Sequence, residues 1–71
     1  MYGERLKQLR KERNIPQQTL AELAGVKIRG YQFYESETTE PNIKALIALA
    51  DFYGVTIDYL VGRTDNPEIN R

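Results

Sequence analysis

The feature that most constrains the fold is a corner of about three residues between two stretches with helical spacing. In "QQTLAELA", residues 17–24, Leu20, Ala21 and Ala24 recur as they would on one face of a helix. Gly25 follows, and glycine readily adopts the left-handed conformation that ends many helices. The next helical stretch begins near residue 28. A connection this short forces the second helix to cross the first at a steep angle.

Two helices joined so tightly form a helix-turn-helix motif. In the second of them, "IRGYQFYE" at residues 28–35, Tyr31 and Tyr34 lie three residues apart. This spacing predicts a shared inner face, because residues three apart are neighbours on a helix surface. The outer face carries Ile28, Arg29, Gln32 and Phe33. A short helix of this kind is held by its neighbours, so its outer face can be left free to meet a partner.

Proline, glycine and capping residues predict three further helices. Leu6 and Leu9 lie on one face of a first amphipathic helix, which Pro16 ends by disfavouring helical geometry at Ile15. Asn42 and Thr56 are typical N-caps of two later helices. The fourth helix is the most apolar, and we expect it to bury Ile43, Leu46, Ile47, Leu49, Ala50 and Tyr53. The fold class is therefore all-α, with five helices at residues 4–13, 17–24, 28–35, 42–53 and 57–61.

Length and composition exclude several classes of protein. The 71 residues suffice for one domain, which we place at residues 1–62, followed by a polar tail at 63–71 that we expect to fray. Without Cys or His, disulfides and the usual zinc sites are excluded. The chain also lacks a phosphate-cradling glycine loop and an evident carboxylate pair, so we expect neither an enzyme nor a cofactor. No apolar run is long enough for a membrane span or a secretory signal, which predicts a cytoplasmic protein.

The charges balance overall but are unevenly distributed. Ten Lys and Arg oppose ten Asp and Glu, which argues against a generic polyanion binder and still allows a locally basic face. The first thirteen positions contain five cations: Arg5, Lys7, Arg10, Lys11 and Arg13. Such a cluster is either a solvated helix face or an electrostatic footprint for nucleic acid, and the sequence leaves both interpretations open.

Two long segments, "RLKQLRKERNIPQQTLAELAGV" and "YESETTEPNIKALIALADFYGVTIDYLVGRTDNPE", resemble the Cro and phage-repressor type of helix-turn-helix regulator, the Xre family. The resemblance runs from about Arg5 to Glu68. Its most specific parts are the "LA" and "GV" of the turn, the "YE" that ends the third helix, and "DYL" with "GRTDNP" near the end. It implies a compact, lambda-repressor-like DNA-binding domain in which the third helix enters the major groove.

The resemblance also implies a set of DNA-contacting residues, with Gln17 opening the second helix as a contact to the backbone or to an edge base. The full set is Gln17, Gln18, Lys27, Ile28, Arg29, Gln32, Phe33, Thr38, Thr39, Asn42 and Lys44. Side-chain chemistry assigns Arg29 to guanine, Gln32 to adenine and Ile28 to a thymine methyl group. The family pattern gives Arg10 and Glu35 a different role, as a partly buried structural ion pair.

Three features depart from the family pattern. Gly30 lies in mid-helix, where it either makes room for Tyr31 or acts as a hinge. Phe33 could contact thymine methyls, form a protein-binding patch or fold back on the following loop. That loop, "SETTE" at residues 36–40, has Glu37 and Glu40 where the family commonly has a glycine and basic residues. Carboxylates there should weaken DNA binding and steepen its loss with salt.

Two functions remain as hypotheses. The first is a bacterial or phage transcriptional regulator, a repressor that binds a two-fold operator in double-stranded DNA as a homodimer, without a small-molecule ligand or a membrane. The candidate dimer contacts are then Ile57, Tyr59, Val61 and the tail, unless these residues only complete the core. The second is a protein-binding adaptor or antirepressor with the same fold, which Ile28, Phe33 and the acidic loop favour.

Overall fold

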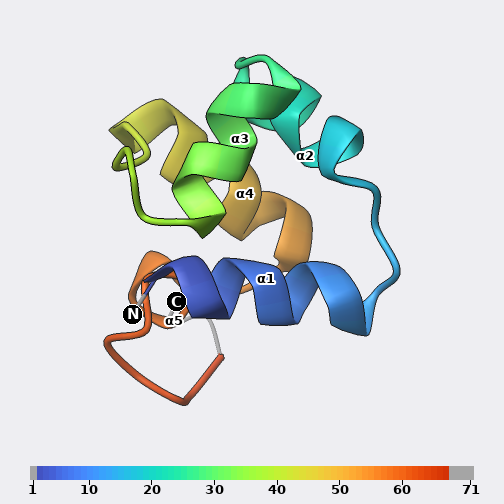
Figure 1. The fold of residues 1–71 in the computed structure, drawn as a ribbon. Helices are drawn as coiled ribbons and strands as arrows, with labels where there is room; N and C mark the ends of the chain where they lie inside the picture. The colour runs from blue at the N-terminus through green and yellow to red at the C-terminus, as the bar shows by residue number, and fades with distance from the viewer. Residues whose placement is uncertain (1, 68–71) are drawn as a thin grey trace.

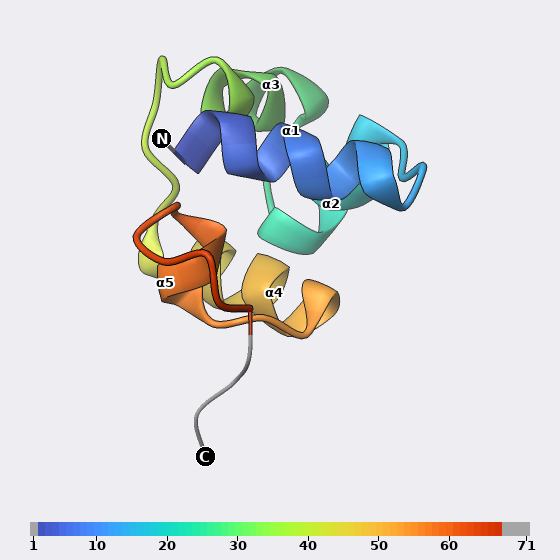
Figure 2. The ribbon, with the colours of Figure 1, turned by 90° about the horizontal axis from the view of Figure 1, so that it is seen from below.

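The computed structural model describes residues 2–67, which form five α-helices and no strand. The helices are α1 (Tyr2–Glu12), α2 (Gln17–Ala24), α3 (Ile28–Glu35), α4 (Ile43–Tyr53) and α5 (Ile57–Leu60). Figure 1 shows α1 running along one side of the molecule, with α3 beside it, α4 behind and α5 near the N-terminal end of α1. The same arrangement is seen from below in Figure 2. The predicted all-α, five-helix fold is thus confirmed.

All five helices contribute to a single core. α3 buries Tyr31 completely and Tyr34 almost completely, and their rings meet edge to face with centroids 6.2 Å apart. Ile15 and Val26, from the two connections that flank α2, pack against the cluster. The buried apolar residues are Leu6, Leu9, Leu20, Ala21, Tyr31, Tyr34, Ala45, Leu49, Ala50, Tyr53, Val55 and Leu60. Burying this many apolar side chains is the main stabilising contribution in a chain without disulfides.

α4 is less buried than its apolar sequence predicts. Ile43 is 72% exposed and Ile47 is 46% exposed, so the prediction that both are buried is wrong. A helix advances by about 100° per residue. The buried positions Ala45, Leu49 and Tyr53 therefore share one side, whereas residues 43 and 47 lie on another. The apolar stripe of α4 is wider than the core can cover.

The corner between α2 and α3 has the predicted geometry. Gly25 has φ +74°, in the left-handed region, and its N–H donates to the carbonyl oxygen of Glu22 at 3.2 Å. The N–H of Val26 donates to the carbonyl of Ala21 at 2.9 Å. These two bonds satisfy carbonyls that the end of a helix leaves free. Lys27 is extended, and α3 begins at the next residue. The helix-turn-helix is therefore present.

The other helix ends differ slightly from the expected ones. α1 begins at Tyr2 rather than residue 4 and ends at Glu12, because Asn14 adopts a left-handed conformation with φ +53°. α4 begins at Ile43, since Asn42 is its N-cap, and α5 ends at Leu60 rather than at residue 61. Shifts of one or two residues leave the topology unchanged.

The segment after α5 is held against α1, so the expected fraying is wrong for its first residues. Nη1 of Arg5 donates to the carbonyl oxygens of Tyr59 at 2.9 Å and Thr64 at 3.2 Å, and Nη2 donates to Asp65 Oδ1 at 2.9 Å. The guanidinium also lies 4.0 Å from the ring centroid of Tyr59, a cation–π geometry. The last four residues of the predicted tail, 68–71, lie outside the described residues. None of the described helices has the length and apolar character needed to cross a membrane.

Candidate nucleic-acid interface

The two faces of α3 separate as the sequence predicts. Tyr31 and Tyr34 point into the core, whereas Lys27, Arg29 and Gln32 are exposed. Ile28 is 40% exposed and Phe33 is 37% exposed, so these two apolar side chains reach the surface on the outer side. The helix thus presents a cation, an amide and two apolar groups on one accessible face. This combination can form both polar and apolar contacts with base edges.

A chain of amide hydrogen bonds links that outer face to α2. Nε2 of Gln32 donates to Gln17 Oε1 at 3.1 Å, and Nε2 of Gln17 points to Glu35 Oε1 at 3.4 Å. Gln17 is half-buried and so connects the exposed Gln32 with the buried Glu35. Because an amide nitrogen carries two hydrogens, Gln32 keeps one donor and its oxygen free. Gln18 is exposed and donates to Glu22 one helical turn away, at 3.2 Å.

Arg10 and Glu35 form a bidentate ion pair between α1 and α3. Nε of Arg10 donates to Glu35 Oε2 at 2.7 Å, and Nη2 donates to Oε1 at 3.0 Å. Only 5% of the Glu35 side chain is exposed. Burial by itself would raise the pKa of Glu35, but the hydrogen bonds and charge of Arg10 outweigh it, and the pKa of Glu35 is lowered. Hydrogen bonding to Glu35 in turn raises the pKa of Arg10. The pair is therefore ionised and fixes the end of α3 to α1.

The basic cluster at the start of the chain divides into two groups. Arg5 holds the segment after α5, Arg10 pairs with Glu35, and Arg13 donates to the carbonyl oxygen of Tyr53 at 2.9 Å. These three arginines therefore stabilise the fold. Lys7 and Lys11 are exposed, and they line a polar hollow of about 330 Å³ beside Gln17 and Gln32. The predicted set of DNA-contacting residues did not include these two lysines. Their spacing of four residues on one helix could have indicated a shared face.

The loop after α3 is tightly folded. The N–H groups of Thr38 and Thr39 both donate to the carbonyl oxygen of Phe33, at 2.9 and 3.3 Å. The hydroxyls of Ser36 and Thr38 lie 2.8 Å apart and share a hydrogen bond, while Thr39 is exposed. Glu37 has φ +63°, a left-handed conformation that costs about 1 kcal/mol or more for a residue other than glycine. Its Oε2 accepts a hydrogen bond from the N–H of Gly3 at 3.0 Å, so this carboxylate lies against α1.

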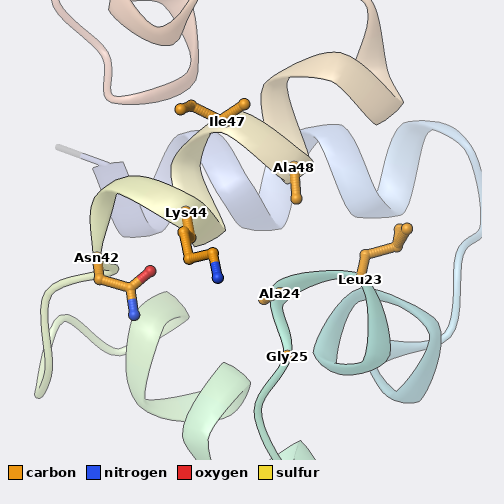
Figure 3. Close-up of a pocket in the computed structure, with 7 residues that line it drawn as sticks. All are labelled: Leu23, Ala24, Gly25, Asn42, Lys44, Ile47 and Ala48. Carbon is orange, nitrogen blue, oxygen red and sulfur yellow. The ribbon is translucent and has the colours of Figure 1, made fainter.

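Asn42 and Lys44 lie at the start of α4, beside a shallow groove. Oδ1 of Asn42 accepts from the N–H of Ala45 at 2.8 Å, so the side chain caps α4 while its amide nitrogen can still donate to a ligand. Lys44 is exposed and extends from α4 across the groove toward the Gly25 corner (Figure 3). The groove has a volume of about 500 Å³. Its lining residues are Leu23, Ala24, Gly25, Asn42, Lys44, Ile47 and Ala48.

At Gly30, α3 packs closely against the corner that follows α2, while room for Tyr31 and a hinge both stay interpretations of this glycine. A Cβ at position 30 would lie 3.3 Å from Cβ of Val26, the residue that follows the Gly25 corner. That separation is tight but not impossible, so the glycine permits close packing of α3 against the corner.

The candidate dimer contacts after α4 are only partly available. Ile57 is 39% exposed, whereas Tyr59 and Val61 are half-buried. Tyr59 packs against the core, and the guanidinium of Arg5 covers its ring. Ile57 is therefore the one member of this set that presents a largely open side chain.

The geometry of the site defines a class of protein. A short helix held by a tight corner exposes Arg29 and Gln32, with lysines and hydroxyls around it, and among residues 2–67 no cluster of side chains could hold a metal ion. This is the architecture of a helix-turn-helix protein. Residues 6–60 match the family model described as Helix-turn-helix. The chain belongs to the helix-turn-helix family of the Cro and phage-repressor type.

Individual relatives agree with this assignment. The chain is 41% identical over 68 residues to YobD of Bacillus subtilis, an HTH-type transcriptional regulator, and the match covers 96% of the chain and 61% of YobD. A transcriptional regulator from Listeria innocua has a similar structure, with a TM-score of 0.85 at 36% identity, covering 93% of the chain and 62% of that protein. The chain spans about three fifths of the length of YobD and of two other curated relatives that it matches.

A second solved structure is the P22 c2 repressor in complex with a synthetic operator. It superimposes on the chain with a TM-score of 0.81 at 33% identity, and the match covers 90% of the chain and 97% of the repressor. The similarity therefore extends over nearly the whole of that repressor chain, which was crystallised with a synthetic operator.

Proposed function

We propose that the chain is a sequence-specific transcriptional regulator that binds double-stranded operator DNA through α3 in the major groove. The observation that carries the proposal is the separation of α3 into a buried tyrosine face and an exposed face with Arg29 and Gln32. The operator complex of the related P22 c2 repressor supports it. Repression by occupying a promoter is the mode of action that we infer, in the cytoplasm of a bacterial cell and without catalysis.

Base recognition is proposed to rest on three side chains of α3. The guanidinium of Arg29 can donate two hydrogen bonds to O6 and N7 of guanine, and Ile28 can pack against a thymine methyl group. Gln32 can donate to N7 of adenine with its second amide hydrogen and accept from N6, while Gln17 holds its first hydrogen. The hydrogen bond from Gln32 to Gln17 therefore orients the amide before DNA arrives. Such preorganisation lowers the cost of ordering the side chain on binding.

Contacts to phosphates are proposed to surround these residues. Lys7 and Lys11 lie on one side of α3, and Lys27, Lys44, Thr38, Thr39 and the amide nitrogen of Asn42 supply further donors. Phosphate contacts supply affinity and register, while base contacts supply sequence preference. Gln18 and Phe33 complete the proposed contact set at its edges.

We infer that the functional unit is a homodimer on a two-fold operator. Two copies of α3 would then lie about 34 Å apart, one helical turn of DNA. Ile57 is the proposed centre of the dimer contact, because it is an exposed apolar residue next to half-buried Val61.

The proposal is tested by comparing Arg29→Ala and Lys44→Ala in binding to operator and to random duplex. Arg29→Ala should reduce the preference at one base pair by about 1–3 kcal/mol. Lys44→Ala should weaken binding to all sequences alike and reduce the salt dependence by about one phosphate contact. Arg63→Ala is the control, because its side chain is 78% exposed and it follows α5, which packs on α1 and α4. If Arg29→Ala and Lys44→Ala bind DNA as the control does, the assignment of α3 to the groove is wrong.

A protein-binding adaptor or antirepressor is the second candidate, which exposed Ile28 and Phe33 favour. The two functions differ in their response to salt. A regulator should bind duplex tightly at low salt and lose affinity steeply as salt rises, whereas an adaptor should have almost no affinity for duplex even in dilute buffer.

A further inference from the structure

The contact between Glu37 and Gly3 joins the loop after α3 to the first turn of α1. Glu37 accepts a hydrogen bond from the N–H of Gly3 across 34 positions of sequence. The N–H groups of the first turn of a helix have no partner within the helix, and the positive end of the helix dipole favours a carboxylate there. Glu37 therefore caps α1 from a distant segment, in the left-handed conformation noted above.

Gly3 is matched to this contact. A Cβ at position 3 would collide with the carbonyl oxygen of Glu35 and would lie 2.8 Å from Cγ of Glu37. Only glycine lets the backbone of α1 approach the end of α3 this closely. A second bond parallels the first, because the hydroxyl of Tyr2 donates to the carbonyl oxygen of Thr39 at 3.2 Å. Burial, followed by the charges of Glu37 and Glu40, raises the pKa of Tyr2.

We infer that Glu37 is a positioning residue for DNA binding, which holds the loop after α3 against α1 and turns its own carboxylate away from the phosphates. The inference rests on the proposed function. The loop so fixed carries Thr38 and Thr39, whose groups are among the proposed phosphate donors. Glu40 differs, because among the described residues it forms no hydrogen bond or ion pair and remains an exposed charge.

Three single variants distinguish a positioning role of Glu37 from a repelling effect of its negative charge on DNA binding. Glu40→Gln removes an exposed negative charge and should raise affinity for duplex about 2- to 5-fold. Glu37→Gln keeps an acceptor for the Gly3 N–H and should change affinity by less than about 2-fold. Glu37→Gly suits the left-handed backbone but removes the acceptor, and it should lower affinity about 2- to 10-fold, the range of one hydrogen bond. If Glu37→Gln and Glu37→Gly both raise affinity as Glu40→Gln does, Glu37 is merely a repelling charge and the inference is overturned.

The contact itself is checked by hydrogen exchange of the Gly3 amide in the free protein. Exchange should be slow in the wild type and in Glu37→Gln, and fast in Glu37→Gly. Gly3→Ala breaks the same contact from the other side, so the double variant with Glu37→Gly should bind DNA no more weakly than Gly3→Ala alone. If the losses of DNA affinity in the two single variants add up in the double variant, Gly3 and Glu37 do not act through one shared contact.

The failures of the two proposals can be told apart. If the wild type binds no duplex at low salt, the proposed function fails and the role of Glu37 falls with it. If the wild type binds and folded Glu37→Gly binds equally well, only the positioning role is overturned.

Discussion

At the scale of the residue, Glu35 occupies the most constrained polar position in the molecule. It is the only charged residue among 2–67 that is buried, with Arg10 on one side and the amide of Gln17 on the other. A buried ion pair adds little net stability, but removing one partner leaves an uncompensated charge. The ion pair between Arg10 and Glu35 therefore affects stability most when one partner is removed.

We expect Arg10→Met to destabilise the protein by about 3 kcal/mol, because the carboxylate of Glu35 stays buried without its partner. Urea denaturation at neutral pH measures the loss. The double variant Arg10→Met with Glu35→Gln should recover a large part of it, since no charge then remains buried. A loss below about 1 kcal/mol in the single variant would mean that solvent screens Glu35, as it does surface pairs.

The sequence allowed the ion pair to be predicted but not the Glu37 cap. Arg10 and Glu35 followed from the resemblance to a known family. Gly3 and Glu37 lie 34 positions apart, and neither belongs to a periodic pattern. Local capping rules search within a few residues, so a cap supplied by a distant loop is invisible to them. This is also why the predicted start of α1 was two residues too late.

At the scale of the element, α4 shows where periodicity succeeds and where it fails. The extent of the helix, its N-cap and its closing Gly54 were all read from local residue types. The exposure of Ile43 and Ile47 could not be predicted in this way. The sequence pattern shows which residues are apolar, but it does not show how wide a stripe the neighbouring helices cover. Only the packing of α2 and α5 on α4 fixes that width.

The start of α4 combines capping with a proposed phosphate contact, and substitutions of Asn42 can separate the two. Asn42→Ala should cost about 1 kcal/mol of stability, the usual value for an N-cap, and should also weaken DNA binding. Asn42→Asp should keep the stability, because Asp caps as well as Asn, while its charge weakens binding to every duplex. Thermal unfolding and duplex titration measure the two effects. Unchanged DNA binding in Asn42→Asp would remove Asn42 from the proposed interface.

At the scale of the whole molecule, long-range contacts determine which basic residues remain available for DNA. The sequence has five cations in the first thirteen positions, and it could not show which of them form long-range contacts and which stay exposed. In the folded chain Arg5, Arg10 and Arg13 each bind a segment at least 25 positions away. Lys7 and Lys11 remain exposed beside Gln17 and Gln32, and no hydrogen bond or ion pair joins their side chains to another of residues 2–67. The helices were thus predictable from local patterns, whereas the composition of the candidate interface depended on tertiary packing.

The core also makes stability depend on pH at the alkaline end. The hydroxyls of Tyr31 and Tyr53 are buried and have no hydrogen-bond partner among the described residues. Burial, with a further contribution from the charge of Glu35, raises the pKa of Tyr53 to about 12. The pKa of Tyr31 is raised as well, by burial and by its proximity to Glu35. In the unfolded chain both phenols should ionise near pH 10.

We therefore expect the free energy of unfolding to fall as pH rises from about 10 to 12. In this window the native state keeps tyrosine protons that the unfolded state has lost, so each added pH unit favours unfolding by up to about 1.4 kcal/mol per tyrosine. Urea midpoints at pH 8, 10 and 11 measure the decline. Tyr53→Phe should make it shallower, and the comparison with the wild type cancels the contribution of lysines, which also lose protons in this range. An identical decline in the variant would mean that the Tyr53 phenol ionises in the native state as readily as in the unfolded chain, and that the core around Glu35 is open to solvent.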